Sequence, residues 1–125
     1  MREDKELKSI RPIIPIEKNN DSNELELFQN EVLRPILKYQ HDIIIQQTSK
    51  ELIIQKKSFR ESTIAEKRIQ IKRYFISQPH LKYFFIGQIC GLMTDDEYDF
   101  YLQNKKELDK RIASMLTDRI LSYYA

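Results

Sequence analysis

The sequence has little of what disulfide-rich or membrane-spanning proteins depend on. Its only cysteine, Cys90, cannot form a bridge within the chain. Its longest apolar run is too short to cross a bilayer and contains Gln88. The first eight residues, Met-Arg-Glu-Asp-Lys-Glu-Leu-Lys, contain no apolar segment of a secretory signal. We therefore expect a cytoplasmic protein that needs no membrane, disulfide or metal to fold.

Charge of neither sign dominates the chain. Its 125 residues include 21 Lys and Arg against 19 Asp and Glu, which gives a net charge of +2. A molecule of this size can bury roughly two thirds of its unfolded surface as one domain. The charges are unevenly distributed, since residues 56–82 hold eight basic and two acidic side chains. This basic block is the one charged segment that indicates a partner.

Glycine is also scarce, and both glycines lie in the most apolar run of the chain, residues 83–93. Gly87 and Gly91 are four residues apart and so share one face of a helix. Each costs a helix interior about 1 kcal/mol relative to alanine. We therefore predict that these two glycines form a helix-packing face, onto which the long helix of the same molecule packs closely.

The N-terminal residues 1–23 differ from the rest of the sequence. Residues 10–16 combine two prolines with four isoleucines, which disfavours a helix and predicts an extended segment. Such an apolar segment is expected to dock across the long helix of its own molecule or onto a second copy. The candidate docking residues are Ile10, Ile13, Ile14 and Ile16.

Helical periodicity continues through the remaining residues, 24–125. A long helix over about 24–56 contains Pro35, which either kinks it or lies in the first turn of a second helix that follows Leu33. Residues 55–62 are expected to connect it to the next helix, which buries Ile64, Ile71, Tyr74 and Phe75. Capping-box patterns begin at Thr63, Thr94 and Asn104. The sequence predicts an all-α, single-domain bundle of about five helices with an extended Pro/Ile-rich N-terminal segment.

Three stretches carry a family resemblance: Glu-Val-Leu-Arg-Pro-Ile-Leu-Lys at 31–38, Ile-Gly-Gln-Ile-Cys-Gly at 86–91 and Glu-Tyr-Asp-Phe-Tyr-Leu-Gln-Asn at 97–104. They resemble a family of small helical bacterial proteins, some of which carry the label glyoxalase. The resemblance covers residues 28–120 and implies a helical bundle, and the label implies a small enzyme. Neither the strand-borne metal ligands of glyoxalase I enzymes nor the histidine motif of glyoxalase II enzymes is present here.

For the residues that could act in catalysis or metal binding, the sequence context favours structural roles. His41-Asp42 is a doublet found in metal-dependent phosphohydrolases, but no further histidine precedes it. His80 opens a helix without a partner acid, and Cys90 is expected to be an inert core thiol. The carboxylates of 95–99 fail the calcium-loop pattern and are expected to cap a helix. We predict no catalytic residue, metal or cofactor.

The basic block contains one candidate binding patch on a predicted helix. It consists of Lys67, Arg68, Lys72 and Arg73. The leading interpretation of the chain is a non-catalytic helical module that binds a protein partner or a second copy of itself. One alternative is a nucleic-acid-associated protein that uses residues 56–82, with aromatic side chains nearby for stacking. A small enzyme of the glyoxalase-labelled family is the other.

Overall fold

The computed structural model describes residues 2–13 and 23–125, and every regular element within them is helical. The all-α prediction is thus confirmed, but the prediction of about five helices is wrong. The described residues form ten α-helical segments and one π-helical turn: α1 (Asp4–Ser9), α2 (Glu24–Phe28), η1 (Gln29–Leu33), α3 (Arg34–Tyr39), α4 (His41–Ser49), α5 (Leu52–Gln55), α6 (Lys57–Arg60), α7 (Ile64–Ser77), α8 (Pro79–Cys90), α9 (Asp95–Gln103) and α10 (Lys105–Tyr124).

The predicted long helix is interrupted at three places: a π turn just before Pro35, and two non-helical residues further along the chain. The Arg34 amide donates to the Gln29 carbonyl five residues back, so the helix widens into η1 just before the proline. A proline ring presses on the carbonyl four residues earlier, and a π turn gives it room. The chain breaks again at Gln40, and Glu51 adopts an extended conformation. The predicted connection over 55–62 in fact contains α6.

Two of the three predicted capping boxes are confirmed. The Glu66 amide donates to Thr63 Oγ1 at 3.1 Å, and the Thr63 amide donates to Glu66 Oε2 at 3.3 Å. Thr94 and Glu97 make the same reciprocal pair at 2.8 and 3.2 Å. The prediction at Asn104 is wrong, because its side-chain amide donates back to the Phe100 carbonyl and so closes α9 instead of opening α10.

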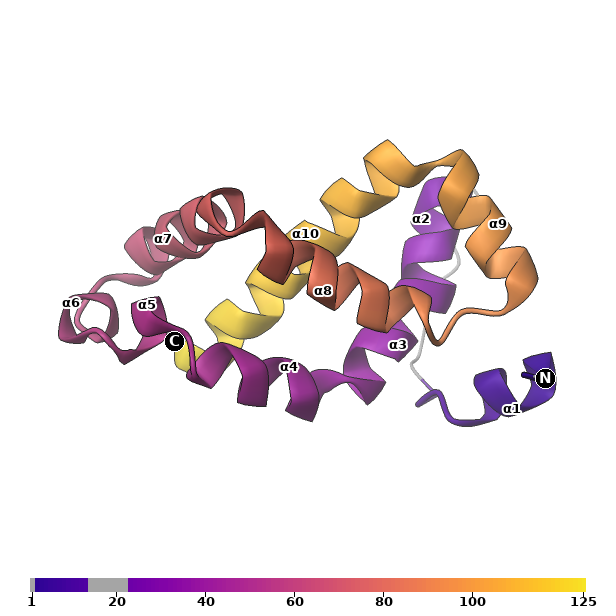
Figure 1. Ribbon diagram of the computed structural model, residues 1–125, viewed down its shortest axis with the longest axis horizontal. Coiled ribbons are helices and arrows are strands. Elements are labelled where there is room, and N and C mark those ends of the chain that lie inside the picture. Colours follow the sequence, from indigo (N-terminus) through magenta and orange to yellow (C-terminus); the bar gives the residue numbers. More distant parts are fainter. Residues whose placement is uncertain (1, 14–22) are drawn as a thin grey trace.

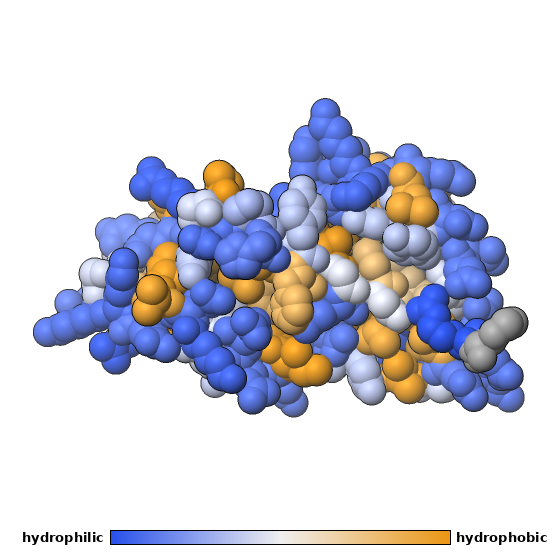
Figure 2. Space-filling view, viewed as in Figure 1, coloured by the Kyte–Doolittle hydropathy of each residue, from blue (hydrophilic) through white to orange (hydrophobic). Residues whose placement is uncertain are grey.

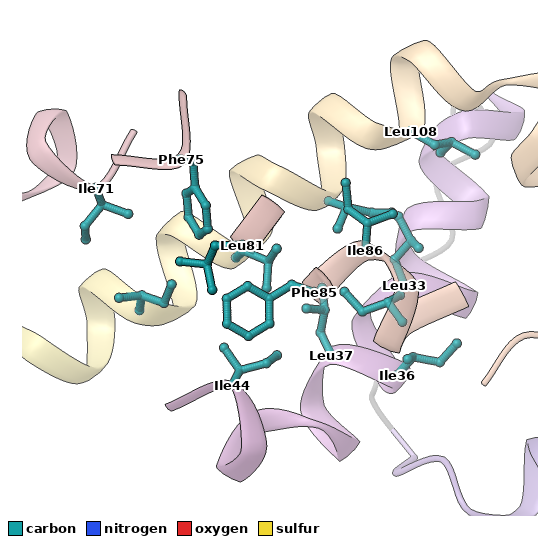
Figure 3. Packing of buried hydrophobic residues seen from close by; sticks show 14 of the residues in the cluster. Leu33, Ile36, Leu37, Ile44, Ile71, Phe75, Leu81, Phe85, Ile86 and Leu108 are labelled. Carbon is teal, nitrogen blue, oxygen red and sulfur yellow. The ribbon is translucent and has the colours of Figure 1, made fainter. Parts of the chain in front are cut away.

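The long C-terminal helix α10 runs diagonally through the molecule and packs against α4, α7, α8 and α9 (Figure 1). Its inward face carries buried apolar residues at three- and four-residue intervals, Leu108, Ile112, Leu116 and Ile120. They meet residues such as Leu33 and Leu37 from the first helices and Phe85 from α8 in one hydrophobic core (Figure 3). Each such side chain stabilises the fold by about 1.5–3 kcal/mol. Ile64, predicted to be buried, is exposed.

In the described part of the N-terminal segment, residues 2–13, two arginines bind the bundle. Residues 4–9 form α1, so the predicted extended conformation does not hold there. Arg11 binds both carboxylate oxygens of Glu97, at 2.6 and 2.8 Å, and the Leu92 carbonyl at 2.8 Å. Ile10 is 39% exposed and Ile13 is 96% exposed, so neither is buried within its own molecule. Their docking onto a second copy stays a prediction. Ile14 and Ile16 lie outside the described residues.

Residues 2–13 therefore contact the bundle at the corner between α8 and α9. Helix ends leave carbonyl groups without helical partners, and arginine is well suited to bind them. Arg2 donates to the Gly91 carbonyl at 2.6 Å, close to the site where Arg11 binds the Leu92 carbonyl. The two arginines on either side of α1 thus bind carbonyls of the turn that directly follows α8.

The predicted packing face at Gly87 and Gly91 is also wrong. Both glycines are exposed, and a Cβ at Gly87 would meet no heavy atom within 4 Å. A Cβ at Gly91 would stand 3.3 Å from the Gly87 carbonyl oxygen of its own helix. The buried face of α8 is the opposite one, which carries Phe85 and Ile89. The four-residue spacing correctly places the glycines together, but on the solvent side.

Candidate functional site

The structure does not bring the four predicted basic-patch residues onto one surface. Lys67 is only 7% exposed, and its ammonium group donates to the Tyr124 carbonyl at 2.9 Å. Arg68 forms an ion pair with Asp118 on α10. Lys72 and Arg73 line two different cavities. A phosphate backbone that followed α7 would therefore not meet all four charges together.

A groove between α7, α8 and α10 is the most apolar of the larger surface cavities, with a volume of about 520 Å³. We call it the lysine groove, because lysines from all three helices stand around an apolar floor. The described residues that line it are Lys72, Phe75, Ile76, Pro79, Lys82, Tyr83, Lys110, Ala113, Ser114 and Thr117. On the face drawn in Figure 2, apolar side chains lie in separate patches between hydrophilic ones.

Helical spacing in each wall explains how the groove forms. Lys72 and Ile76 are one turn apart on α7, and Pro79 and Tyr83 are one turn apart on α8. Gln78 between these helices leaves the helical conformation, and Pro79 starts α8 in the position that proline tolerates best. The α10 wall carries the small residues Ala113 and Ser114, which keep the space between the helices open.

The groove is electropositive. No carboxylate is among the described residues that line it. Lys110 lies 3.6 Å from Glu107, but both side chains are well exposed, and such a pair contributes little. The Lys82 and Lys105 ammonium groups stand 5.6 and 5.5 Å from the centre of the Tyr83 ring. Ile76, on the edge, is 80% exposed, so the site combines accessible apolar surface with positive charge.

A partly buried polar network lies beside the Tyr83 end of the groove. The Tyr101 hydroxyl donates to Asp109 Oδ1, and the Lys105 ammonium binds Asp109 Oδ2, both at 2.5 Å. Burial is the main cause that raises the pKa of the Tyr101 phenol, and the hydrogen bond to Asp109 raises it further. The Asp109 hydrogen bond raises the pKa of Lys105. The network thus holds a protonated phenol and a charged ammonium on one carboxylate.

Cys90 is close to this network and is not activated by it. Burial is the main cause that raises the pKa of its thiol to about 11, and this outweighs the opposing effect of Tyr101. The group therefore stays a thiol at neutral pH, which agrees with the predicted inert role. A thiolate nucleophile, which an enzyme mechanism at this cysteine would need, is not available.

The two histidines lie on different elements. His41, the first residue of α4, has its Nδ1 3.1 Å from an Arg119 guanidinium nitrogen. His80 is exposed in the first turn of α8. In the part of the chain that the structure describes, no three His, Cys, Asp or Glu side chains are grouped so that they could hold a metal ion.

Comparison with protein-family models, with curated proteins and with solved structures found no match for this chain. The resemblance to the glyoxalase-labelled family therefore stays a prediction. None of the helices in residues 2–13 and 23–125 combines the length and the apolar character that crossing a membrane requires.

Part of the lysine groove lies in a segment that the sequence singles out for another reason, and the rest was not predicted. Lys72 and Lys82 belong to the basic block over 56–82. Lys110 and the neighbouring small residues lie far along the chain in α10 and join the site only through helix packing. The signal in the sequence was a single lysine at 110 followed by small residues at 113, 114 and 117 on the same face of α10.

Proposed function

We propose that this chain is a helical protein-interaction module whose lysine groove binds an acidic amphipathic helix of a partner protein. The observation that carries the proposal is the combination of an apolar floor with three rim lysines and no lining carboxylate. A helix laid in such a groove buries its apolar stripe on Ile76 and Tyr83. Its flanking carboxylates then approach Lys72, Lys82 and Lys110.

The geometry favours a helix over a nucleic acid. A nucleic-acid surface needs a continuous row of cations along the backbone path, whereas Lys67 and Arg68 are already occupied by contacts within the molecule. Apolar contact supplies most of the affinity in a helix-in-groove complex, and the charges at its edge set the rate of association and the preference for an acidic partner. The lysine groove has both features.

The test is fluorescence anisotropy with a labelled amphipathic peptide that carries leucines at one helical face and glutamates beside them. A control peptide has lysine at each glutamate position. We expect the acidic peptide to bind and the basic peptide to bind at least tenfold more weakly, with an affinity that falls as salt is raised. Equal binding of the two peptides, or binding of neither, contradicts the proposal.

Two variants locate the binding site on the protein. Ile76→Asp places a charge on the apolar edge and is expected to weaken peptide binding at least tenfold, because the exposed side chain contributes to binding rather than to the core. Ile64→Asp is the matched control, since Ile64 is an exposed isoleucine of the same helix that does not line the groove. Equal loss of binding in both variants would place the peptide elsewhere.

The chain itself carries a helix of the required kind, which makes a second copy a specific candidate partner. On α9, Asp95, Tyr98, Asp99 and Leu102 share one face, and all four are exposed. Docking of α9 into the groove of another molecule would be head-to-tail, which builds rings or chains. Sedimentation velocity tests this: self-association that both Ile76→Asp and Leu102→Asp abolish identifies the second copy as the occupant, and a monomer at all concentrations excludes it.

A further inference from the structure

A second cavity, separate from the lysine groove, lies between the first helices and the C-terminal half of α10. Its volume is about 630 Å³. Residues of η1, α3 and α4 form one wall, and residues 115–123 of α10 form the other. Its polar lining includes Asn30, Arg34, His41, Asp118 and Arg119. We call it the arginine cavity.

The two arginines of this cavity have no carboxylate partner among the described residues. No ion pair of Arg34 or Arg119 within 4.0 Å is present in residues 2–13 and 23–125. Arg119 instead donates to Nδ1 of His41 at 3.1 Å. A guanidinium can only donate, so Nδ1 accepts and the imidazole is held with its proton on Nε2. His41 thereby orients Arg119 without neutralising its charge.

Among the described residues that line the cavity, Asp118 is the one carboxylate. It pairs with Arg68 and forms no ion pair with Arg34 or Arg119. Arg111 adds a further positive charge close by, because its guanidinium donates to the side chain of Gln29 in the cavity wall at 2.7 Å. Burial, and then the charge of Arg34, lower the pKa of Arg119. A bound anion would relieve both of these unfavourable effects.

We propose that the arginine cavity is a binding site for a small phosphorylated molecule, with the phosphate held between the guanidinium groups of Arg34 and Arg119. Guanidinium groups bind phosphate oxygens through paired, charge-assisted hydrogen bonds, and two arginines match a doubly charged phosphate monoester. The Asn30 side chain and the Nε2 proton of His41 supply neutral polar groups for the rest of the molecule. The volume is several times that of a phosphate group, so the ligand extends beyond the phosphate.

The experiment is isothermal titration calorimetry of the full chain with ribose 5-phosphate, inorganic phosphate and a 20-nucleotide single-stranded DNA, all at one ionic strength. Ribose 5-phosphate is expected to bind more tightly than inorganic phosphate, because only the ester can also contact the cavity walls beyond the phosphate site. Arg34→Gln and Arg119→Gln should each weaken binding roughly ten- to hundredfold, the range for loss of a charge-assisted pair. Arg73→Gln removes the same charge from an exposed site outside the cavity and should change binding less than twofold.

A variant that is expected to bind phosphate more tightly distinguishes the loss of a contact from unfolding of the protein. Asp118→Asn removes the one carboxylate among the described lining residues and should tighten phosphate binding roughly two- to fivefold. Absence of heat with both phosphates, equal weakening by Arg73→Gln, or weaker binding in Asp118→Asn would overturn the proposal. Tighter binding of the DNA than of the ester would also overturn it, since a small-molecule cavity gives no advantage to a polymer.

Discussion

Replacing Arg11 by methionine should destabilise the protein far more than any other change in the N-terminal segment. The Arg11 and Glu97 side chains are only 8% and 14% exposed, and they share a two-pronged ion pair. Removal of one partner leaves the other charge buried without compensation, which costs about 3–5 kcal/mol in a fully buried pair. Because Glu97 keeps some exposure, we expect Arg11→Met to lower the free energy of unfolding by about 2–4 kcal/mol. With a urea slope of roughly 1.5 kcal/mol/M, this loss lowers the urea midpoint by roughly 1.3–2.7 M.

The same pair predicts how stability depends on pH. Burial alone would raise the pKa of Glu97, but the hydrogen bonds and charge of Arg11, together with Thr94, outweigh it and hold the pKa below its ordinary value. A carboxyl with a lowered folded pKa stabilises the protein fully above its unfolded pKa of about 4.3 and loses this contribution as the pH falls through the folded pKa. Stability of the wild type should therefore fall more steeply below about pH 4.3 than that of Arg11→Met.

A double-mutant cycle with Glu97→Gln isolates the pair, because glutamine can keep the capping box of α9. Arg2→Met is the matched control: its pair with Asp95 is 48% and 94% exposed and should contribute at most about 0.5 kcal/mol. The reasoning is refuted if urea unfolding gives a coupling energy below about 0.5 kcal/mol, or if the two arginine variants are equally destabilised.

The remaining predictions concern α8 and the network beside it. Gly87→Ala should raise the free energy of unfolding, measured by urea titration, by up to about 1 kcal/mol. The new methyl group meets no neighbour, and alanine has the higher helix propensity. A destabilised variant would show a close packing partner. Alkylation of Cys90 by iodoacetamide should accelerate with pH up to about 11 without an earlier plateau, since burial raises the pKa of the thiol to about that value; a plateau near pH 8 would contradict this. Tyr101→Phe should cost about 1–3 kcal/mol in thermal or urea unfolding, because buried Asp109 loses one of its two hydrogen-bond donors. An unchanged stability would contradict this.

Features encoded within a few neighbouring residues could be predicted from the sequence. The capping boxes at Thr63 and Thr94 depend on one side chain and an amide three residues away, so no tertiary information is needed. The pattern at Asn104 fails because the same side chain can close the preceding helix, and only the packed structure decides between the two bonds.

Features that depend on which side of a helix faces the core could not be predicted in the same way. The spacing of Gly87 and Gly91 fixes a shared face but not its orientation. For the basic patch, helix geometry alone shows that the four residues cannot share one narrow face. At about 100° per residue, positions 67, 68, 72 and 73 spread over roughly 240° of the circumference of α7. The arginine cavity joins residues about 80 positions apart, such as His41 and Arg119, and needs the fold itself.

The most direct test of the central claim is to map binding of the acidic amphipathic peptide by amide chemical shifts of the isotope-labelled protein. Binding in the lysine groove predicts that the largest shifts occur at Ile76, Tyr83, Lys110 and Ala113, from all three walls, and that they vanish in Ile76→Asp. Shifts centred on Arg73 or on the α8–α9 corner, or no shifts at millimolar peptide, would contradict the proposed function.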